Sequence, residues 1–224
     1  MTMFLFPKTC PCCQHTLLPG EGPLCLKCLS GLPRIHAEFP DNAVEARMVG
    51  QFPFEHATAF CYYHHEGMMA KALTQAKYKN RPWVNADLTQ LFVQELSLAH
   101  SSWPYDIDVI IPIPIHWTRL FSRGYNQSMA IAEALHDAWH LPIESHCLHK
   151  KYTRHTQVGL GREERLHSVV GTFYVSHSER LRDKHILLVD DVLTTGATLV
   201  AASDALLENV PGVRISFLTL AMGS

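Results

Sequence analysis

The sequence predicts an α/β fold in which a parallel sheet is flanked by helices and preceded by a small cysteine-rich unit. Short runs of branched apolar residues at 109–111 and 186–189 predict strands that are covered on both faces, which is typical of a parallel sheet. Each run is followed by a polar turn and then by helical apolar spacing. With 224 residues, 47% of them apolar, the chain can form one sizeable core and a small appendage.

The amino-terminal cysteines form two Cys-x-x-Cys pairs, Cys10 with Cys13 and Cys25 with Cys28. This spacing is typical of a tetrahedral zinc site with four thiolate ligands. A segment of about 40 residues cannot form a self-supporting core, whereas structural zinc contributes about 10–16 kcal/mol of binding free energy. We therefore expect zinc to fold this segment. Cys12 or His15 could also share in the site.

The domain organisation follows from the change in composition after the cysteines. We expect a zinc ribbon at residues 1–40 and a second domain at 52–224. Residues 41–51 between them show no clear periodicity and are interpreted as a linker or a loosely packed connection.

Charge and composition exclude several classes of protein. The formal net charge is −2 and the pI is about 6.7, so any contact with nucleic acid or an anionic membrane must come from a local patch. The sequence shows neither a signal peptide nor a run of about 18 apolar residues that could span a membrane. We expect a cytoplasmic protein, in which seven cysteines favour metal binding over disulfides.

The second domain is expected to begin with a strand at 60–63 and two amphipathic helices. Apolar residues from Met69 to Ala76 recur at helical spacing, and that helix should end near Lys79. Leu88 to Leu96 show the same spacing in a second helix.

A polar, basic loop is expected after the strand at 109–111. It contains Arg119 and Arg123, and it leads to a helix whose apolar face runs from Ile131 to Trp139. Loops that leave the carboxyl ends of parallel strands gather at one edge of the sheet, so the two arginines could reach a shared cleft. The alternative is that they are exposed and solvate a turn.

Residues 147–170 are locally basic in a chain that is not. Lys150, Lys151, Arg154 and Arg162 lie in this segment, and two glycines at its centre are typical of a mobile lid that closes over an anion. A solvated basic surface and a nucleic-acid patch are the alternatives. A strand is expected to follow at 172–175.

The stretch HILLVDDVLTTGAT, residues 185–198, carries the most chemistry. Burying each apolar residue of 186–189 stabilises the fold by about 1.5–3 kcal/mol, whereas an unpaired buried carboxylate costs several kcal/mol. Asp190 and Asp191 should therefore emerge at the carboxyl end of the strand. Thr194, Thr195 and Gly196 then precede a helix at 197–208, and Thr198 lies in its first turn. Free backbone N–H groups at a helix start favour a phosphate monoester.

Two other kinds of protein place acids after a buried strand. A Walker B strand needs a G-x-x-x-x-G-K-[ST] partner, but no glycine in this chain precedes a lysine. A response-regulator receiver would place its acid pair near the start of the domain, not at residue 190.

This stretch resembles the phosphoribosyl pyrophosphate (PRPP) loop of the type I phosphoribosyltransferases. The resemblance implies that Asp190 and Asp191 hold the ribose hydroxyls, that the turn binds the 5′-phosphate, and that Mg²⁺ accompanies PRPP. The PRPP-binding residues that it implies are Asp190, Asp191, Val192, Leu193, Thr194, Thr195, Gly196, Ala197 and Thr198, with Arg119 and Arg123 near the pyrophosphate. Lys150, Lys151, Arg154 and Arg162 are the candidates for stabilising the leaving pyrophosphate. Lys150, Arg154 and Arg162, together with Asp190 and Asp191, form the expected catalytic set.

The order of four blocks resembles the ComF family, whose members are also known as GntX-like or amidophosphoribosyltransferase-like proteins. The blocks are the cysteine pairs, PIPIHWTRLFSRGYNQ, HTQVGLGREERLHSVVGTF and VDDVLTTGAT. The resemblance implies a zinc ribbon joined to a type I phosphoribosyltransferase domain, with a role in natural transformation or use of extracellular DNA. Two features depart from the pattern of the family: Trp117 stands where relatives often have proline, and the chain ends at Ser224. Both departures concern the acceptor pocket.

Two functions from different classes follow from this resemblance. One is a PRPP-binding transformation protein that acts on the cytoplasmic side, on or near incoming single-stranded DNA, with DNA-uptake or DNA-processing proteins as partners. The other is an active phosphoribosyltransferase of nucleoside metabolism, which transfers phosphoribose to a base or nucleotide-like acceptor. We lean to the first, with transferase activity toward an unknown acceptor left open.

Overall fold

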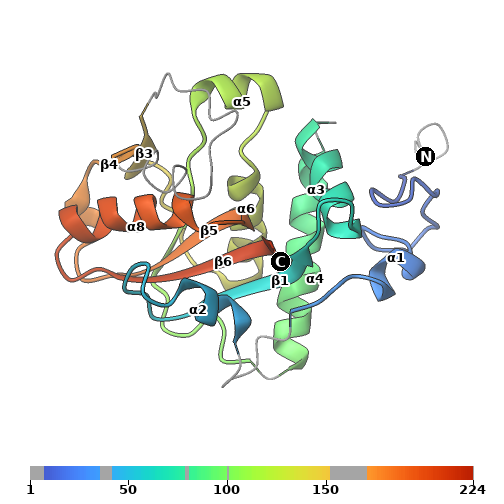
Figure 1. Cartoon of the computed structure of the whole chain (residues 1–224), viewed down its shortest axis with the longest axis horizontal. Helices are drawn as coiled ribbons and strands as arrows, with labels where there is room; N and C mark the ends of the chain where they lie inside the picture. The colour runs from blue at the N-terminus through green and yellow to red at the C-terminus, as the bar shows by residue number, and fades with distance from the viewer. Residues whose placement is uncertain (1–7, 36–41, 79–80, 100, 152–170, 224) are drawn as a thin grey trace.

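A four-stranded parallel sheet with the order β1-β6-β5-β2 forms the centre of the molecule (Figure 1). The computed structural model describes residues 8–35, 42–78, 81–99, 101–151 and 171–223. The strands of the sheet are β1 (Ala57–Tyr63), β2 (Val109–Pro112), β5 (His185–Leu193) and β6 (Arg214–Gly223). The predicted fold class, a parallel sheet flanked by helices, is confirmed.

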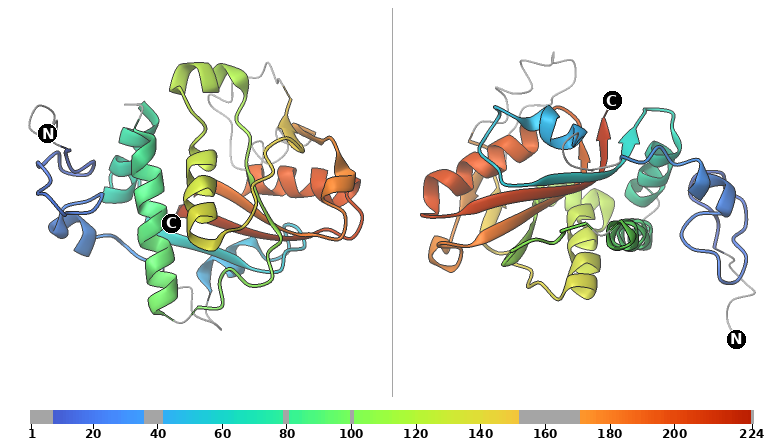
Figure 2. Two further views of the ribbon diagram at one scale, coloured as in Figure 1. Left: turned by 180° about the vertical axis from the view of Figure 1, so that it is seen from behind. Right: turned by 90° about the horizontal axis from the view of Figure 1, so that it is seen from below.

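Helices cover both faces of the sheet (Figure 2). The larger helices are α3 (Met68–Tyr78), α4 (Pro82–Leu98), α6 (Gln127–Trp139) and α8 (Ala197–Asn209). The short ones are α1 (Leu26–Ser30), α2 (Ala43–Met48), α5 (Trp117–Arg123) and the 3₁₀ turn η1 (Ser178–Arg180). Helices α2 and α8 pack on one face with one apolar cluster, and α4 and α6 pack on the other with a second cluster.

The apolar run in β5 shows why the sheet is buried on both sides. Ile186 and Leu188 belong to the cluster under α8, and Leu187 and Val189 belong to the cluster under α4 and α6. All four side chains are fully buried. Alternate residues of a strand point to opposite faces, so an unbroken apolar run is needed here. Strand β6, which the sequence analysis did not predict, fills the centre of the sheet between β1 and β5.

The cysteine-rich unit lies beyond α3 and α4, away from α8 (Figures 1 and 2). A bridge between Thr9 and Thr16 closes its first turn, in which the Cys10 N–H donates to the His15 carbonyl at 2.7 Å. The unit adds a few apolar side chains to the cluster under α3 and α4, namely Leu17, Leu24 and Leu32.

The expectation of a loose connection before the second domain is wrong for the described residues 42–51. Helix α2 forms there, capped by the Asn42 side chain, which accepts from Val44 N–H at 3.0 Å. Val44 and Met48 are fully buried in the cluster under α8. Apolar burial therefore fixes a segment whose sequence lacks periodicity, while the proposed division at residues 40 and 52 stays a prediction.

The predicted basic loop after β2 is also wrong, because residues 117–123 form helix α5. The His116 side chain accepts from Thr118 N–H at the start of this helix, and Gly124 ends it with φ +81°.

Residues 173–175, expected as a strand, form β4 (Phe173–Val175). This strand pairs antiparallel with β3 (Leu148–Lys150) in a separate two-stranded sheet.

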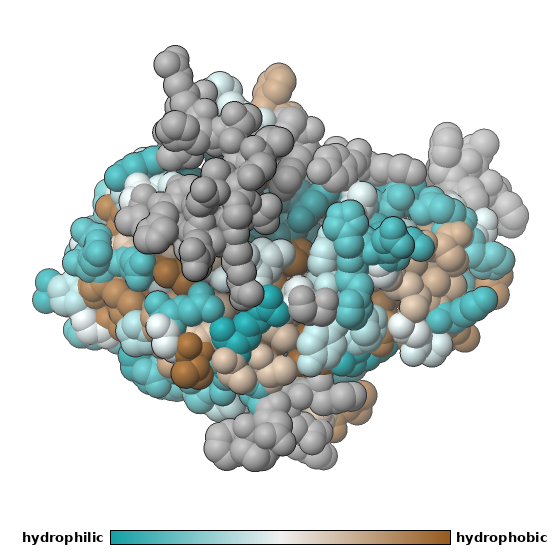
Figure 3. Space-filling view, in the orientation of Figure 1, coloured by the Kyte–Doolittle hydropathy of each residue, from teal (hydrophilic) through white to brown (hydrophobic). Residues whose placement is uncertain are grey.

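The described surface is of mixed polarity. Hydrophilic and hydrophobic side chains alternate over the face shown in Figure 3. Within the described residues, no helix is both long enough and apolar enough to cross a bilayer.

Candidate functional site

The two acids lie at the point where β5 loses its neighbour on one side. Strand β2 pairs with β5 only as far as Pro112 opposite Val189, where the Ile113 N–H donates to the Val189 carbonyl at 2.9 Å. On the other side, β6 continues beyond Asp190 to Met222, which pairs with Leu193. The strand therefore remains fixed while one of its edges opens beside Asp190 and Asp191.

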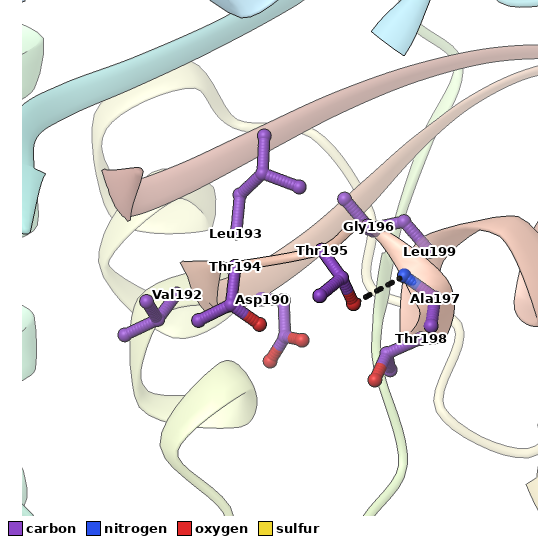
Figure 4. Close-up of a pocket in the computed structure, with 9 residues that line it drawn as sticks. All are labelled: Asp190, Val192, Leu193, Thr194, Thr195, Gly196, Ala197, Thr198 and Leu199. Atoms are coloured by element: carbon purple, nitrogen blue, oxygen red, sulfur yellow. Dashed lines mark hydrogen bonds between the residues drawn. The ribbon is translucent and has the colours of Figure 1, made fainter. Parts of the chain in front are cut away.

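A small pocket follows the acids, in the turn between β5 and α8 (Figure 4). The Asp190 carboxylate and the hydroxyls of Thr194, Thr195 and Thr198 lie on the same side of this turn, whereas Leu193 points the opposite way. The residues that line the pocket are Asp190, Val192, Leu193, Thr194, Thr195, Gly196, Ala197, Thr198 and Leu199. The structure thus brings Asp190 and the predicted residues 192–198 together around one space, whereas Asp191 is not among the residues that line it.

Gly196 fixes the shape of the turn. It precedes α8 with φ +83°, a conformation that costs other residues about 1–2 kcal/mol. A Cβ at this position would lie 2.8 Å from Met48 Sδ and 2.9 Å from Gln51 Oε1. The segment around α2 therefore forms the back wall of the turn, although the sequence analysis gave it no role in the site.

Asp190 is held by the first turn of α6. Its Oδ1 accepts from Ser128 Oγ at 3.0 Å and from the Asp191 N–H at 2.9 Å. Asn126 fixes that turn, because its side chain accepts from Ser128 N–H and donates to the Ile113 carbonyl, each at 3.1 Å. Burial, together with the neighbouring charge of Asp191, raises the pKa of Asp190 to about 6 despite these hydrogen bonds.

Asp191 pairs with a lysine from α3. Lys77 Nζ lies 2.5 Å from Asp191 Oδ2, and the side chains are only 23% and 14% exposed. The loop before α6 holds the same end of α3, because the Tyr125 hydroxyl donates to the Ala76 carbonyl at 2.9 Å. The sequence analysis missed both Lys77 and Ser128. The signal for Lys77 was a basic residue at the end of an amphipathic helix, which is common on exposed helix ends.

The other predicted cations are not brought to the acids by any described contact. The backbone of Arg119 and Arg123 lies in α5, but their side chains are outside the described part of the structure. Lys150 lies in β3 with its amine 5.0 Å from the centre of the Phe173 ring, and Lys151 is exposed. Arg154 and Arg162 lie outside the described residues.

The cysteine unit brings four thiols together. The Sγ atoms of Cys10, Cys13, Cys25 and Cys28 all lie within 4.8 Å of one another, and those of Cys13 and Cys25 are 3.7 Å apart. A tetrahedral zinc ion with bonds of about 2.3 Å needs sulfur atoms just under 4 Å apart, so small movements would complete the site. The donor set therefore fits the predicted metal.

Cys12 and His15, the two alternatives, lie outside this group of thiols. The Cys12 Sγ donates to the Met68 carbonyl at 3.3 Å, and burial raises the pKa of its thiol to about 12. The side chain of His15 is exposed. For Cys10, burial is outweighed by hydrogen bonds from the backbone at Cys25, Cys13 and Cys12, so the thiol pKa falls to about 7. Its thiolate, the form that binds metal, is therefore well populated near neutral pH.

Comparisons with known proteins match both parts of the chain. A model of the phosphoribosyl transferase domain matches residues 131–223. "Competence protein ComFC" of Bacillus subtilis is 27% identical over 95% of this chain and 83% of its own length. "DNA utilization protein YhgH" of Shigella flexneri is 24% identical over 92% of this chain and 94% of its own length.

A solved structure of a purine phosphoribosyltransferase from Pyrococcus horikoshii is similar to part of the chain. It is 21% identical and covers 59% of this chain and 73% of its own, with a TM-score of 0.37. The domain match, the full-length relatives and the clustered cysteines agree with the blocks found in the sequence. These findings support the predicted resemblance to the ComF family of phosphoribosyltransferase-like proteins.

Proposed function

We propose that the chain binds PRPP and acts in natural transformation or the use of extracellular DNA. In this proposal it works on the cytoplasmic side, on or near incoming single-stranded DNA and together with DNA-uptake or DNA-processing proteins. The names of two relatives, which refer to competence and to DNA utilization, support the biological role. The reduced thiols of a zinc ribbon are also typical of a reducing compartment.

The observation that carries PRPP binding is the common orientation of the Asp190 carboxylate and three threonine hydroxyls around the turn (Figure 4). Carboxylates accept hydrogen bonds from sugar hydroxyls, so Asp190 and Asp191 would hold the ribose. The hydroxyls of Thr194, Thr195 and Thr198, with backbone N–H groups at the start of α8, would donate to the 5′-phosphate. Val192, Leu193, Gly196 and Ala197 would complete the backbone of the turn.

Two metals belong to the proposal. Zinc would be held by Cys10, Cys13, Cys25 and Cys28 and would be structural. Magnesium, when bound with PRPP, would neutralise part of the diphosphate charge.

The basic side chains are proposed to act on the diphosphate. Arg119 and Arg123 follow the end of β2 in sequence, at the edge of the sheet where Asp190 lies. Lys150, Arg154 and Arg162 belong to the basic segment after β3. Their positive charge would stabilise the diphosphate as it leaves, if transfer follows binding.

Isothermal titration calorimetry with Mg–PRPP tests the binding site. The wild-type protein should release heat on binding, and Asp190→Ala and Asp191→Ala should each weaken binding at least tenfold. Asp137→Ala, an exposed acid on α6, serves as the control and should bind like the wild type. Pyrophosphate release in the same samples would report transfer or hydrolysis. Wild-type protein that binds no Mg–PRPP would refute the proposal.

Fluorescence anisotropy with a labelled single-stranded oligonucleotide tests the DNA part separately. Binding should weaken as salt rises, and a double change of Lys150 and Lys151 to Ala should weaken it further. Asp190→Ala should bind the oligonucleotide at least as well as the wild type, because it removes a negative charge. Anisotropy that does not change on adding protein at low salt would refute direct DNA binding and leave PRPP binding intact.

A further inference from the structure

Each of the two acids at the end of β5 has its own partner on a helix. Ser128 of α6 donates to Asp190 at 3.0 Å, and Lys77 of α3 pairs with Asp191 at 2.5 Å. Among the described residues, the other ion pairs between a lysine or arginine and an acid do not involve Asp190 or Asp191. Lys77–Asp191 is therefore the ion pair at this site.

We propose that Lys77 is a positioning residue of the PRPP site, which orients Asp191 and supplies the positive charge that lets two carboxylates receive an anionic sugar phosphate. This inference rests on the proposed PRPP binding and adds to it a residue that the PRPP-loop motif does not contain. The motif ends at residue 198, whereas Lys77 lies more than a hundred residues earlier in the chain.

Charges of both signs meet at the site. Two adjacent carboxylates repel each other and would also repel a phosphorylated ligand. An ion pair that is mostly shielded from solvent is screened much less than a surface pair. Lys77 is therefore placed to offset this repulsion before any ligand arrives.

The geometry leaves Asp191 able to bind a ligand. A carboxylate has two oxygens and about four acceptor positions. Lys77 is close to Oδ2, and in this proposal Oδ1 accepts from a ribose hydroxyl. Lysine has three donors, and an ion pair with one oxygen does not use all of them.

The position of Lys77 is fixed by packing and not by its side chain alone. Ala72, Leu73 and Ala76 of α3 are buried in the cluster shared with α4 and β1. The Tyr125 hydroxyl holds the last turn of α3 next to the segment that leads to Ser128. The segments that carry Lys77 and Ser128, the partners of the two acids, are thus linked by a hydrogen bond, as expected for a preorganised site.

Calorimetry with Mg–PRPP tests the inference with matched variants of α3. Lys77→Met should weaken binding at least tenfold, and Lys77→Arg should restore part of the loss because it keeps the charge. Lys71→Met, an exposed lysine on the same helix, should bind like the wild type. Ser128→Ala should cost less than Lys77→Met because it removes no charge. Circular dichroism and thermal melting check that each variant is folded.

The pH profile distinguishes positioning from a merely structural role. The positive charge of Lys77 lowers the pKa of Asp190, so without it the pH below which Mg–PRPP binding weakens should move upward in Lys77→Met. A folded Lys77→Met protein with wild-type affinity and an unchanged profile would overturn the inference. If the wild type itself bound no Mg–PRPP, the proposed function would fail instead.

Discussion

The cysteine unit and the acid-bearing turn are both short polar segments, but different forces hold them in place. The turn connects β5 to α8, and residues 186–189 of β5 are fully buried from both faces of the sheet. The cysteine unit has a helix of five residues and two isolated bridges, Thr9 with Thr16 and Arg34 with Cys61 of β1, and it adds few apolar side chains to the core. Its shape must therefore come largely from the four thiols and their metal.

This difference predicts where each segment is vulnerable. The turn is attached to a rigid, buried sheet. A substitution in the turn should therefore alter local geometry and ligand binding more than overall folding. A change at the thiols removes the main force that folds the unit. The two regions are also joined, because α3 begins at Met68, whose carbonyl accepts from Cys12 Sγ, and carries Lys77 near its end.

The largest effect should follow from loss of a metal ligand. Structural zinc contributes about 10–16 kcal/mol of binding free energy, so Cys28→Ser should lose the metal and unfold residues 8–35. Elemental analysis should find about one zinc per wild-type chain and much less in the variant, and limited proteolysis should cut the variant within this range. Cys12→Ser, whose thiol lies outside the group, should keep its zinc. Full zinc content and protease resistance in Cys28→Ser would contradict the proposed site.

The next effect should come from a methyl group added to the turn. Gly196→Ala meets Met48 Sδ and Gln51 Oε1 in addition to an unfavourable φ, so we expect a stability loss of about 3 kcal/mol. Gly50→Ala is the matched control, because its φ is +80° and nothing lies within 4 Å of the added Cβ. That variant should lose only about 1 kcal/mol. Urea denaturation compares the two, and equal losses would show that α2 does not restrict the turn.

The sequence predicted those parts of the fold that depend on local pattern. The apolar run at 186–189 identified β5, and the acids and threonines after it identified the turn. The four thiols were likewise predicted from their spacing. The helix at α5 was missed although His116 and Gly124 cap it, because the basic residues between them were taken as a loop signal.

The missed parts of the site depend on tertiary contacts. Ser128 is 62 residues from its partner Asp190, and Lys77 is farther still from Asp191. Met48 reaches Gly196 only because α2 packs beside α8 on the sheet. No local pattern in the sequence specifies these pairs, since they arise from the order in which distant elements pack.

A third prediction concerns the stability cost of the acids. The pKa of Asp190 in the folded protein is about 6, above its ordinary value of 3.8, so the folded state binds this proton more tightly than the unfolded state. The ionised carboxylate therefore destabilises the fold above pH 6, and the cost disappears as the pH falls from 6 toward 4. Asp190→Asn should be about 2 kcal/mol more stable than the wild type at pH 7.5.

Urea denaturation at several pH values measures this effect. The advantage of Asp190→Asn should shrink as the pH falls through 6 and approach zero below pH 3.8, where the wild-type carboxyl is protonated in both states. Asp137→Asn should show little change at any pH, because this residue is exposed. A destabilised Asp190→Asn at pH 7.5 would mean that its hydrogen bonds outweigh burial and the charge of Asp191.

The smallest effect should come from the ion pair that joins the cysteine unit to α4. Arg34 Nη2 lies 2.8 Å from Glu95 Oε1, and Nε donates to the same carboxylate at 3.1 Å. The guanidinium also lies 5.5 Å from the centre of the Phe60 ring. Glu95 is 40% exposed, so solvent screens the pair, and we expect a coupling energy of about 1 kcal/mol or less.

A double-mutant cycle with Arg34→Met and Glu95→Gln isolates this coupling from the separate effects of each change. Both replacements keep most of the side-chain volume, so packing against Phe60 should largely survive. Raising the salt concentration should reduce the coupling further. A coupling energy well above 1 kcal/mol would mean that direct contacts with α4 hold the cysteine unit more strongly than its small core suggests. The cysteine unit and the acid-bearing turn would then differ less in how much tertiary contacts stabilise them.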